Sequence, residues 1–397
     1  MSQQPPRFPF CFEGDRIAPE LAERAAHCPV SEVLTNTDNR AWLIAGYEEV
    51  RTVLRDRRFS LSLTSDPDAP RQDPLYPPPT VTDTLTYFQR TGMLPALHRG
   101  LGPAQQHLTA GTIADLVRGV LRPFLAREEQ PADLITGFVF PLSRLLTFAL
   151  LGVTPDGCPD DSVLFGIFRT GPDSGERVPA CWEAGQTYML AQLPRLRRRR
   201  EGLLGELIGP ADRAGTLAEE EIADLFLFLL ISQYGNPATF LGAAVAALMR
   251  HPDLVDRLRA EPGLMPRAVD ELLRWTVFLG DGLARVARED VTVGGVRIRR
   301  GELVLVSTDA ANHDPRVFPD PQRLDIDRPE NPHLRFSHGR HRCPGRSVAA
   351  LQAEVTLRTL LEETGDLGLA VPPDAVVWHP YHAITLPQSL PVRWTRP

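Results

Sequence analysis

The chain has 397 residues, of which 43% are hydrophobic and 23% charged, values typical of a folded protein with a sizeable buried core. Its net charge of −7 argues against a general nucleic-acid binder, and no stretch has the length and apolar character of a membrane-spanning helix. The start lacks a signal-peptide pattern, and the five cysteines are scattered without zinc-like spacing, so we expect a cytoplasmic protein that does not bind membranes.

The first two thirds of the sequence are dominated by helical periodicity. Residues 41–59 predict a strand that runs into a short amphipathic helix, and the proline-rich residues 67–79 predict an irregular loop. Beyond this loop, helices are predicted at 104–128, 131–153, 183–209, 217–250, 252–260 and 264–276. The chain is therefore expected to be mainly α-helical.

The C-terminal part adds a small β portion. Two alternating β-rich runs around glycines predict a hairpin at 291–307, and the Asp- and Pro-rich residues 314–332 predict coil. A helix at about 344–363 then precedes a β-rich tail. No repeat or linker divides the chain, so we expect one mainly α domain with a small β portion over residues 1–397.

The most informative segment is FSHGRHRCPG, residues 336–345. Its cysteine, Cys343, stands at the start of a predicted helix, where unpaired backbone N–H groups and the positive end of the helix dipole stabilise a thiolate. A thiolate can ligate a haem iron. Gly339 and Gly345 permit close approach of the backbone to a flat cofactor, and His341 with its arginine neighbours supplies donors for carboxylates. Taken alone, the segment also fits a structural cysteine at a helix cap in a basic loop.

Phe336, Gly339, Cys343 and Gly345 reproduce the pattern Phe-x-x-Gly-x-x-x-Cys-x-Gly, and the segment therefore resembles the haem-binding signature of the cytochrome P450 family. The resemblance implies the mainly helical cytochrome P450 fold and oxidoreductase activity. It also implies a haem b cofactor (iron protoporphyrin IX) with Cys343 as the ligand of its iron. Some proteins of this fold have lost haem and serve as activating partners of glycosyltransferases, but the intact Cys343 weighs against that hypothesis.

Further motifs support the same resemblance. Glu271 and Arg274 match the Glu-x-x-Arg helix motif of the family, and their i, i+3 spacing places both charges on one helix face. The family locks this pair with a third basic residue, and Arg328 occupies the matching place. Residues 311–321 resemble the family's Asn-x-Asp-Pro-x-x-Phe-x-x-Pro run, and residues 389–394 resemble its C-terminal tail. The resemblance is continuous over the C-terminal half and fainter toward the N-terminus.

The resemblance also implies groups that hold the haem propionates. Arg285 stands where relatives place an arginine on a propionate, His341 matches a common propionate donor, and His98 matches the histidine at the start of the family's C helix. A surface arginine and, for His98, a loop histidine are the simpler interpretations. Gly102 and Pro103 replace arginines that are common in this helix, which puts its propionate clamp and standard ferredoxin docking in question.

The long apolar helix predicted at 217–250 carries Gln233, Gly235, Asn236 and Pro237 in its middle, and the resemblance places this stretch across the haem face opposite the thiolate. Most oxygen-activating relatives have an acidic residue followed by threonine where this chain has Gly235 and Asn236; that pair relays protons, which is general acid catalysis. A proline within a helix frees the carbonyl group four residues earlier and kinks the helix. We therefore expect a break at which Asn236 or Gln233 hydrogen-bonds substrate or water. The alternative is that Pro237 only shapes a wide pocket.

Other segments are expected around the substrate. The resemblance implies pocket contributions from residues 76–97, 277–283 and 386–389. The arginine run at 195–200 falls in a segment expected to form a helix over the substrate entrance. It is interpreted either as a solvated helix face or as a rim that recognises a carboxylated substrate or an acidic carrier protein.

These observations lead to one leading hypothesis and two alternatives. The leading hypothesis is a haem-thiolate monooxygenase that acts on a small organic substrate of secondary metabolism, with electrons from a ferredoxin-type partner. The first alternative keeps the haem but catalyses dehydration, rearrangement, coupling or peroxide-driven chemistry, which the absent acid–alcohol pair makes reasonable. The second is a haem-free auxiliary protein.

Overall fold

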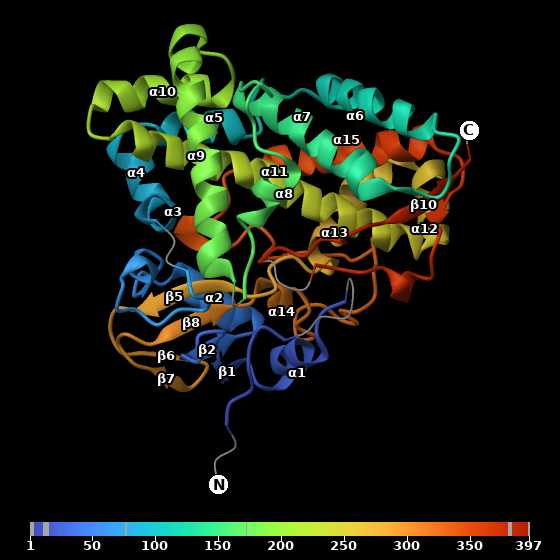
Figure 1. The fold of residues 1–397 in the computed structure, drawn as a ribbon. Helices are drawn as coiled ribbons and strands as arrows, with labels where there is room; N and C mark the ends of the chain where they lie inside the picture. The colour runs from blue at the N-terminus through green and yellow to red at the C-terminus, as the bar shows by residue number, and fades with distance from the viewer. Residues whose placement is uncertain (1–3, 11–15, 76–77, 172, 380–382, 396–397) are drawn as a thin grey trace.

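The computed structural model describes residues 4–10, 16–75, 78–171, 173–379 and 383–395. Most of the molecule is helical (Figure 1). The largest sheet and α1 lie together at one end of the molecule. The helices are α1 (Pro19–His27), α2 (Tyr47–Arg55), α3 (Pro79–Thr82), α4 (Thr84–Arg90), α5 (Leu94–Leu101), α6 (Ala110–Leu125), α7 (Phe140–Leu151), α8 (Asp161–Gly166), α9 (Ser174–Arg199), α10 (Gly202–Ala214), α11 (Glu219–Met249), α12 (Pro252–Ala260), α13 (Met265–Trp275), α14 (Thr308–Asn312) and α15 (Arg346–Glu363). The strands are β1 (Val30–Leu34), β2 (Arg40–Ile44), β3 (Phe59–Ser60), β4 (Ala132–Asp133), β5 (Leu283–Ala287), β6 (Val291–Val293), β7 (Val296–Ile298), β8 (Leu303–Val306), β9 (Leu367–Leu369) and β10 (Pro391–Trp394). The fold is mainly α with a small β portion, as the sequence predicts.

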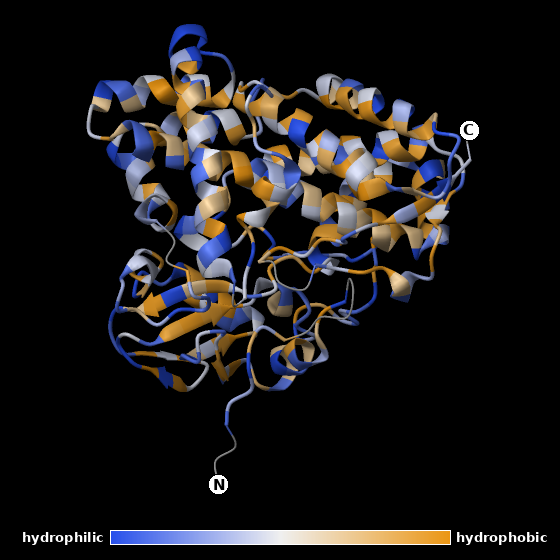
Figure 2. Ribbon diagram, viewed as in Figure 1, coloured by the Kyte–Doolittle hydropathy of each residue, from blue (hydrophilic) through white to orange (hydrophobic). Residues whose placement is uncertain are grey.

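The largest sheet has five strands in the order β1-β2-β8-β5-β3. Strands β2 and β8 pair in parallel, and the other neighbours are antiparallel. The sheet is largely hydrophobic (Figure 2), and β8, with the sequence LVLV, is buried along its whole length. A three-stranded sheet β4-β10-β9 and the hairpin β6-β7 complete the β portion. Because β5 is held between β8 and β3, the position of Arg285 within it is fixed from both sides.

Two secondary-structure predictions need correction. The helix predicted at 183–209 is in fact two helices, α9 and α10, because Arg200 and Gly202 between them adopt left-handed backbone with φ of 56° and 66°. The hairpin predicted at 291–307 ends at Ile298, and the following β-rich run forms β8 of the larger sheet. An alternating pattern identifies a strand but does not identify its partners, which here come from distant parts of the chain.

Helix α11 crosses the helical region and packs against α7, α8, α9, α12, α13 and α15. Its side chains are apolar all round, which explains why most of them are buried. The exceptions in its middle are Phe228, Ser232, Gln233, Asn236 and Pro237, which are partly exposed. Their spacing of about four residues places them on one face, so a single face of α11 is left unpacked. No helix within the described residues has the length and apolar character needed to cross a membrane.

Pro237 does not interrupt α11, contrary to the expected break. The helix is continuous from Glu219 to Met249. Proline has no backbone N–H, so the Gln233 carbonyl oxygen lacks its usual helical partner. Packing on the flanking turns outweighs this one lost hydrogen bond; for example, a Cβ atom on Gly242 would stand only 2.9 Å from the Leu386 side chain.

Candidate active site

A tight loop positions Cys343 just before α15. The Cys343 backbone N–H donates a hydrogen bond to the Phe336 carbonyl oxygen (2.9 Å), which closes the loop. Within it Gly339 has a φ of +71°, and a Cβ atom there would stand 2.5 Å from the Leu54 carbonyl oxygen. A left-handed residue in such close contact with the backbone of α2 has to be glycine. The loop therefore brings the predicted residues Phe336, Gly339 and Cys343 together and docks them on the end of α2.

The Cys343 side chain is accessible at the end of the loop. Its neighbours Arg342 and Pro344 are solvent-accessible too. Desolvation nevertheless raises the pKa of the thiol above its ordinary value, although a hydrogen bond from the Gly345 backbone N–H and the charge of Arg342 act in the opposite direction. The sulfur is thus accessible, although surrounding protein atoms desolvate it. A cationic metal centre beside it would supply the stabilisation that a thiolate still needs.

Strand β5 and the Cys343 loop bring Arg285 and His341 together. The Arg285 side chain is 4% exposed, and among the described residues its guanidinium has the Ala284 carbonyl oxygen (2.7 Å) as its acceptor and no carboxylate within ion-pair distance. Burial lowers the pKa of Arg285 to about 10. Burial and then the charges of Arg285 and Arg340 lower the pKa of His341 to about 4. Asp83 acts on His341 in the opposite direction, but it forms no ion pair with His341 or Arg285 within the described residues. A buried cation with an imidazole in its electrostatic range can therefore accept an anionic group.

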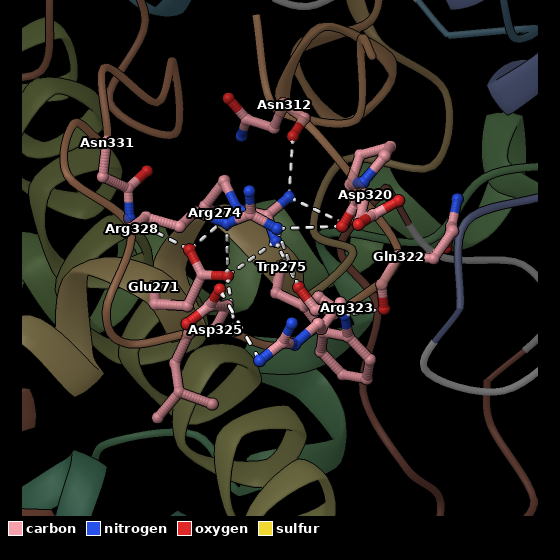
Figure 3. Close-up of polar contacts among 12 residues, drawn as sticks. Glu271, Arg274, Trp275, Asn312, Asp320, Gln322, Arg323, Asp325, Arg328 and Asn331 are labelled. Carbon is pink, nitrogen blue, oxygen red and sulfur yellow. Dashed lines mark hydrogen bonds and ion pairs between the residues drawn. The ribbon is translucent and has the colours of Figure 1, made fainter.

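A buried ion-pair network fixes the segment that leads into the Cys343 loop (Figure 3). The Arg274 guanidinium donates two hydrogen bonds to the Glu271 carboxylate (2.8 and 2.7 Å), and both side chains are at most 1% exposed. Its other N–H groups bind carbonyl oxygens of Asn312, Pro321 and Arg323. The Arg328 Nε atom donates to Glu271 Oε1 (3.0 Å), which confirms Arg328 as the predicted third basic residue. The network ties α13 to residues 312–331.

The unpacked face of α11 approaches the Cys343 segment. The Gln233 Nε2 atom stands 3.4 Å from the place where a Cβ atom of Gly345 would be, and the Cys343 Sγ atom stands 3.7 Å from the same place. Three predicted residues from distant parts of the chain therefore meet at one point. Asn236 and Pro237 follow on the same face, one turn later. Among the described residues, Asn236 has no polar partner in the chain, so its carboxamide is available to another molecule.

A phenyl ring fills the place of the acidic residue that most relatives carry on this helix. A Cβ atom on Gly235 would stand 2.4 Å and 2.7 Å from two ring atoms of Phe168, and 3.2 Å from Ile384 Cδ1. Any larger residue at position 235 would therefore require Phe168 to move. Nothing in the sequence marks Phe168, because the contact depends on the path of the segment between α8 and α9.

No contact among the described residues joins His98 to this cluster. It is exposed in the last turn of α5, whereas it was expected at the start of a helix. The described residues give it no hydrogen bond or ion pair within the chain. The helix ends at Leu101, because Gly102 and Pro103 follow with an extended backbone at Gly102.

The arginine run is largely neutralised within the chain. It forms the end of α9, where Arg197 pairs with Asp212 (2.9 Å) and Glu219 (2.6 Å). Arg195 pairs with Glu201 (2.7 Å) and also donates to a backbone carbonyl oxygen. These contacts join the end of α9 to α10 and α11, and they favour a structural helix end over an anion-recognising rim.

Comparisons with known proteins identify the family. Residues 191–364 match the family described as Cytochrome P450. The chain is 34% identical to the mycocyclosin synthase of Mycobacterium tuberculosis over 97% of this chain and 98% of that protein. The chain belongs to the cytochrome P450 family. This cytochrome P450 is also 34% identical to the mycinamicin IV hydroxylase/epoxidase of Micromonospora griseorubida, over 99% of this chain and 100% of that protein. The crystal structure of HinD with NMFT and NO covers 99% of this chain and 100% of that chain, at 35% identity, with a TM-score of 0.83.

Family membership makes the protein a monooxygenase-type oxidoreductase with a haem-iron cofactor, as the sequence predicts. The residues of the site fit that group. Cys343 offers a thiol at an accessible yet desolvated position, and Arg285 offers a buried positive charge that no carboxylate of the described residues pairs. Haem iron needs a ligand such as the thiolate, and the haem propionates need a positively charged partner such as the arginine.

Proposed function

We propose that this cytochrome P450 binds haem b with Cys343 as the axial ligand and oxidises a small organic molecule of secondary metabolism. The observation that carries the ligand assignment is the accessible, desolvated Cys343 sulfur in a loop closed by the Phe336 carbonyl group. Haem bound there would supply the redox centre, and electron donation from the sulfur would favour O–O bond cleavage. We also propose a ferredoxin-type electron donor and a cytoplasmic location.

We further propose that Arg285 and His341 bind the haem propionates. A carboxylate between them would give the buried Arg285 guanidinium the counter-charge that it lacks within the chain. It would also favour the protonated form of His341 and so raise the pKa that the two arginines now lower. His98 is a third candidate donor, and its exposed side chain on α5 is free to reach a ligand.

On the α11 side, Gln233 and Asn236 are the residues proposed to act during the reaction. Carboxamides donate and accept hydrogen bonds but do not release protons at neutral pH, so neither residue is a general acid. They are expected to hold and orient substrate or water, and protons then come from water or from the substrate itself. Pro237 contributes by leaving the Gln233 carbonyl oxygen available to a water molecule. Gly235 contributes by admitting the Phe168 ring, which excludes water at that point.

The Phe168 ring over Gly235 favours a second candidate function, which is coupling or rearrangement of the substrate. Oxygenation needs protons delivered beside the iron, and the usual acid is replaced here by a packed apolar contact. A redox-neutral rearrangement, or coupling with peroxide as the two-electron oxidant, would not depend on that delivery, because the first consumes no protons and peroxide brings its own. The similar proteins include a hydroxylase/epoxidase and a cytochrome P450 described as having biaryl coupling reactivity.

A substrate panel tests the two reactions against each other. Haem-loaded protein is incubated with each compound under oxygen gas enriched in a heavy isotope, in three arms that contain a ferredoxin system, peroxide, or neither. Product that carries the heavy isotope only in the ferredoxin arm supports monooxygenation. Unlabelled product that has lost hydrogen supports coupling. Absence of haem uptake by the purified protein would refute both.

A further inference from the structure

An acidic residue, Asp281, stands at the tip of a turn beside the site. The Gly282 backbone N–H donates to the Leu279 carbonyl oxygen (3.3 Å), which closes the turn, and Gly282 has a φ of +73°. The turn cannot move freely, because the Asp309 carboxylate holds the N–H groups of Phe278 and Leu279 (2.9 Å each). Asp281 therefore occupies a defined position at the end of the predicted pocket segment.

The turn belongs to the same wall as Phe168 and Gly235. The Gly280 N–H donates to the Ala383 carbonyl oxygen (3.2 Å), and the Ala383 N–H donates to the Phe168 carbonyl oxygen (2.7 Å). Phe168 and Ile384 in turn contact α11 at Gly235. Two backbone hydrogen bonds thus connect the Asp281 turn to the ring that covers the middle of α11.

Within the part of the chain that the structure describes, the Asp281 carboxyl group has no partner from another residue. Its Oδ1 atom is buried and receives no hydrogen bond, although the residue as a whole is partly exposed and so borders an accessible space. The charged group that acts on it is another acid, Asp73, and burial together with Asp73 raises the pKa of Asp281 to about 7. Asp73 itself is satisfied, since its Oδ1 accepts hydrogen bonds from the Gly171 N–H (2.9 Å) and from Asn36 Nδ2 (2.8 Å).

We propose that Asp281 is a substrate-recognition residue whose carboxyl group accepts a hydrogen bond from a nitrogen-borne hydrogen of the substrate. The proposal rests on the proposed function, because it assumes that the substrate occupies the space between α11 and this wall. A purely structural acid in a folded protein is paired by the chain, as Asp73 is, because a buried unpaired carboxyl group is unfavourable. Among the described residues no basic group acts on Asp281, whose charged neighbour is a second acid, and this favours a donor that carries positive charge. Such charge-assisted hydrogen bonds are the stronger ones.

Three probes of equal size test the proposal on haem-loaded enzyme. They are phenethylguanidinium, which is a cation with N–H groups, phenethylurea, which has neutral N–H groups, and methyl 3-phenylpropanoate, which has none. Binding is followed by ligand-observed NMR, which requires no turnover. The variants are Asp281→Asn, which keeps an acceptor but loses the charge, and Asp281→Leu, which removes both. Asp115→Asn, on the exposed face of α6, is the matched control.

We expect wild-type enzyme to bind the guanidinium about tenfold or more tightly than the ester, with the urea between them. Asp281→Asn should remove most of the advantage of the guanidinium, Asp281→Leu should abolish both preferences, and Asp115→Asn should change neither. Equal binding of all three probes, or preferences that survive in Asp281→Leu, would overturn the proposal. The absorption spectrum of each variant is recorded first. A normal haem spectrum with no preference refutes the role of Asp281 alone, whereas absent haem refutes the proposed function.

Discussion

Replacing Arg285 by methionine is expected to change the haem-free and haem-loaded proteins in opposite directions. In the haem-free protein the described residues offer the buried guanidinium one carbonyl acceptor and no carboxylate, and burial lowers its pKa from 12.5 to about 10. One pKa unit corresponds to about 1.4 kcal/mol, so the buried charge costs about 3 kcal/mol of folding free energy. Arginine is charged in the folded and unfolded chains at neutral pH, so this cost is constant there and declines only as the pH rises above about 10.

Methionine fills much of the same space without a charge. The free energy of unfolding of the haem-free Arg285→Met protein is therefore expected to rise by about 1–3 kcal/mol, as when buried charges are replaced by apolar groups. The haem-loaded variant loses a charge-assisted hydrogen bond to a propionate, and its affinity for haem is expected to fall about tenfold or more. Urea unfolding followed by circular dichroism measures the first quantity, and haem transfer to an apo-globin acceptor measures the second.

Arg288→Met is the matched control, because Arg288 follows the same strand but is exposed and hydrogen-bonded to Ser60. It should change neither quantity by more than a small amount. The reasoning is refuted if Arg285→Met destabilises the haem-free protein, or if it stabilises that protein and leaves haem affinity unchanged. The second result would mean that Arg285 is buried without a role in haem binding.

Three further changes have defined outcomes. Arg274→Ala leaves the Glu271 carboxylate buried without its bidentate partner, and it should lower the free energy of unfolding by about 3–5 kcal/mol. Arg274→Lys should have an intermediate effect. Urea titration measures both, and an unchanged unfolding midpoint would contradict the role of the network. Gly235→Asp should impair folding or haem loading because of the Phe168 ring, and Phe168→Ala should restore both in the double variant; failure of this rescue would refute the contact. Asp281→Asn should stabilise the enzyme increasingly as the pH rises from about 4 to 7, and by a constant amount above that. Burial raises the pKa of Asp281 to about 7, so over this range the unfolded wild type ionises while the folded wild type stays protonated and loses stability. Thermal unfolding with a flat difference across that range would contradict it.

The part of the site that lies close in sequence could be predicted. The Cys343 loop depends on a glycine with left-handed backbone and on a helix that begins at Arg346. The ten residues 336–345 and the helical pattern directly after them predict both features. The Glu271–Arg274 pair follows from spacing on one helix turn. The contact between Arg328 and Glu271 could be predicted only from the family resemblance, because it joins two segments that are distant in the sequence.

The part that depends on tertiary packing could not be predicted. The helical periodicity of the sequence continues through Arg200, so it does not indicate where α9 ends. The helix ends there because Arg200 and Gly202, in a polar stretch, adopt left-handed backbone. Pro237 indicates a break by its chemistry alone, whereas the surrounding packing keeps α11 continuous. Phe168 and Asp281 gain their significance from backbone pairing with residues 383–384, which no local pattern reports.

The absorption spectrum of the reduced carbon monoxide complex tests the central claim most directly, because its long-wavelength Soret band depends on a cysteine thiolate bound to the haem iron. Wild-type protein purified with haem is predicted to show this band, and Cys343→Ser, which replaces the sulfur by oxygen with little change of shape, is predicted to lose it. Cys181→Ser serves as the control, since Cys181 lies in α9 and packs against Gly166. A wild-type protein without the band, or a Cys343→Ser variant that keeps it, would contradict the assignment of Cys343 as the ligand.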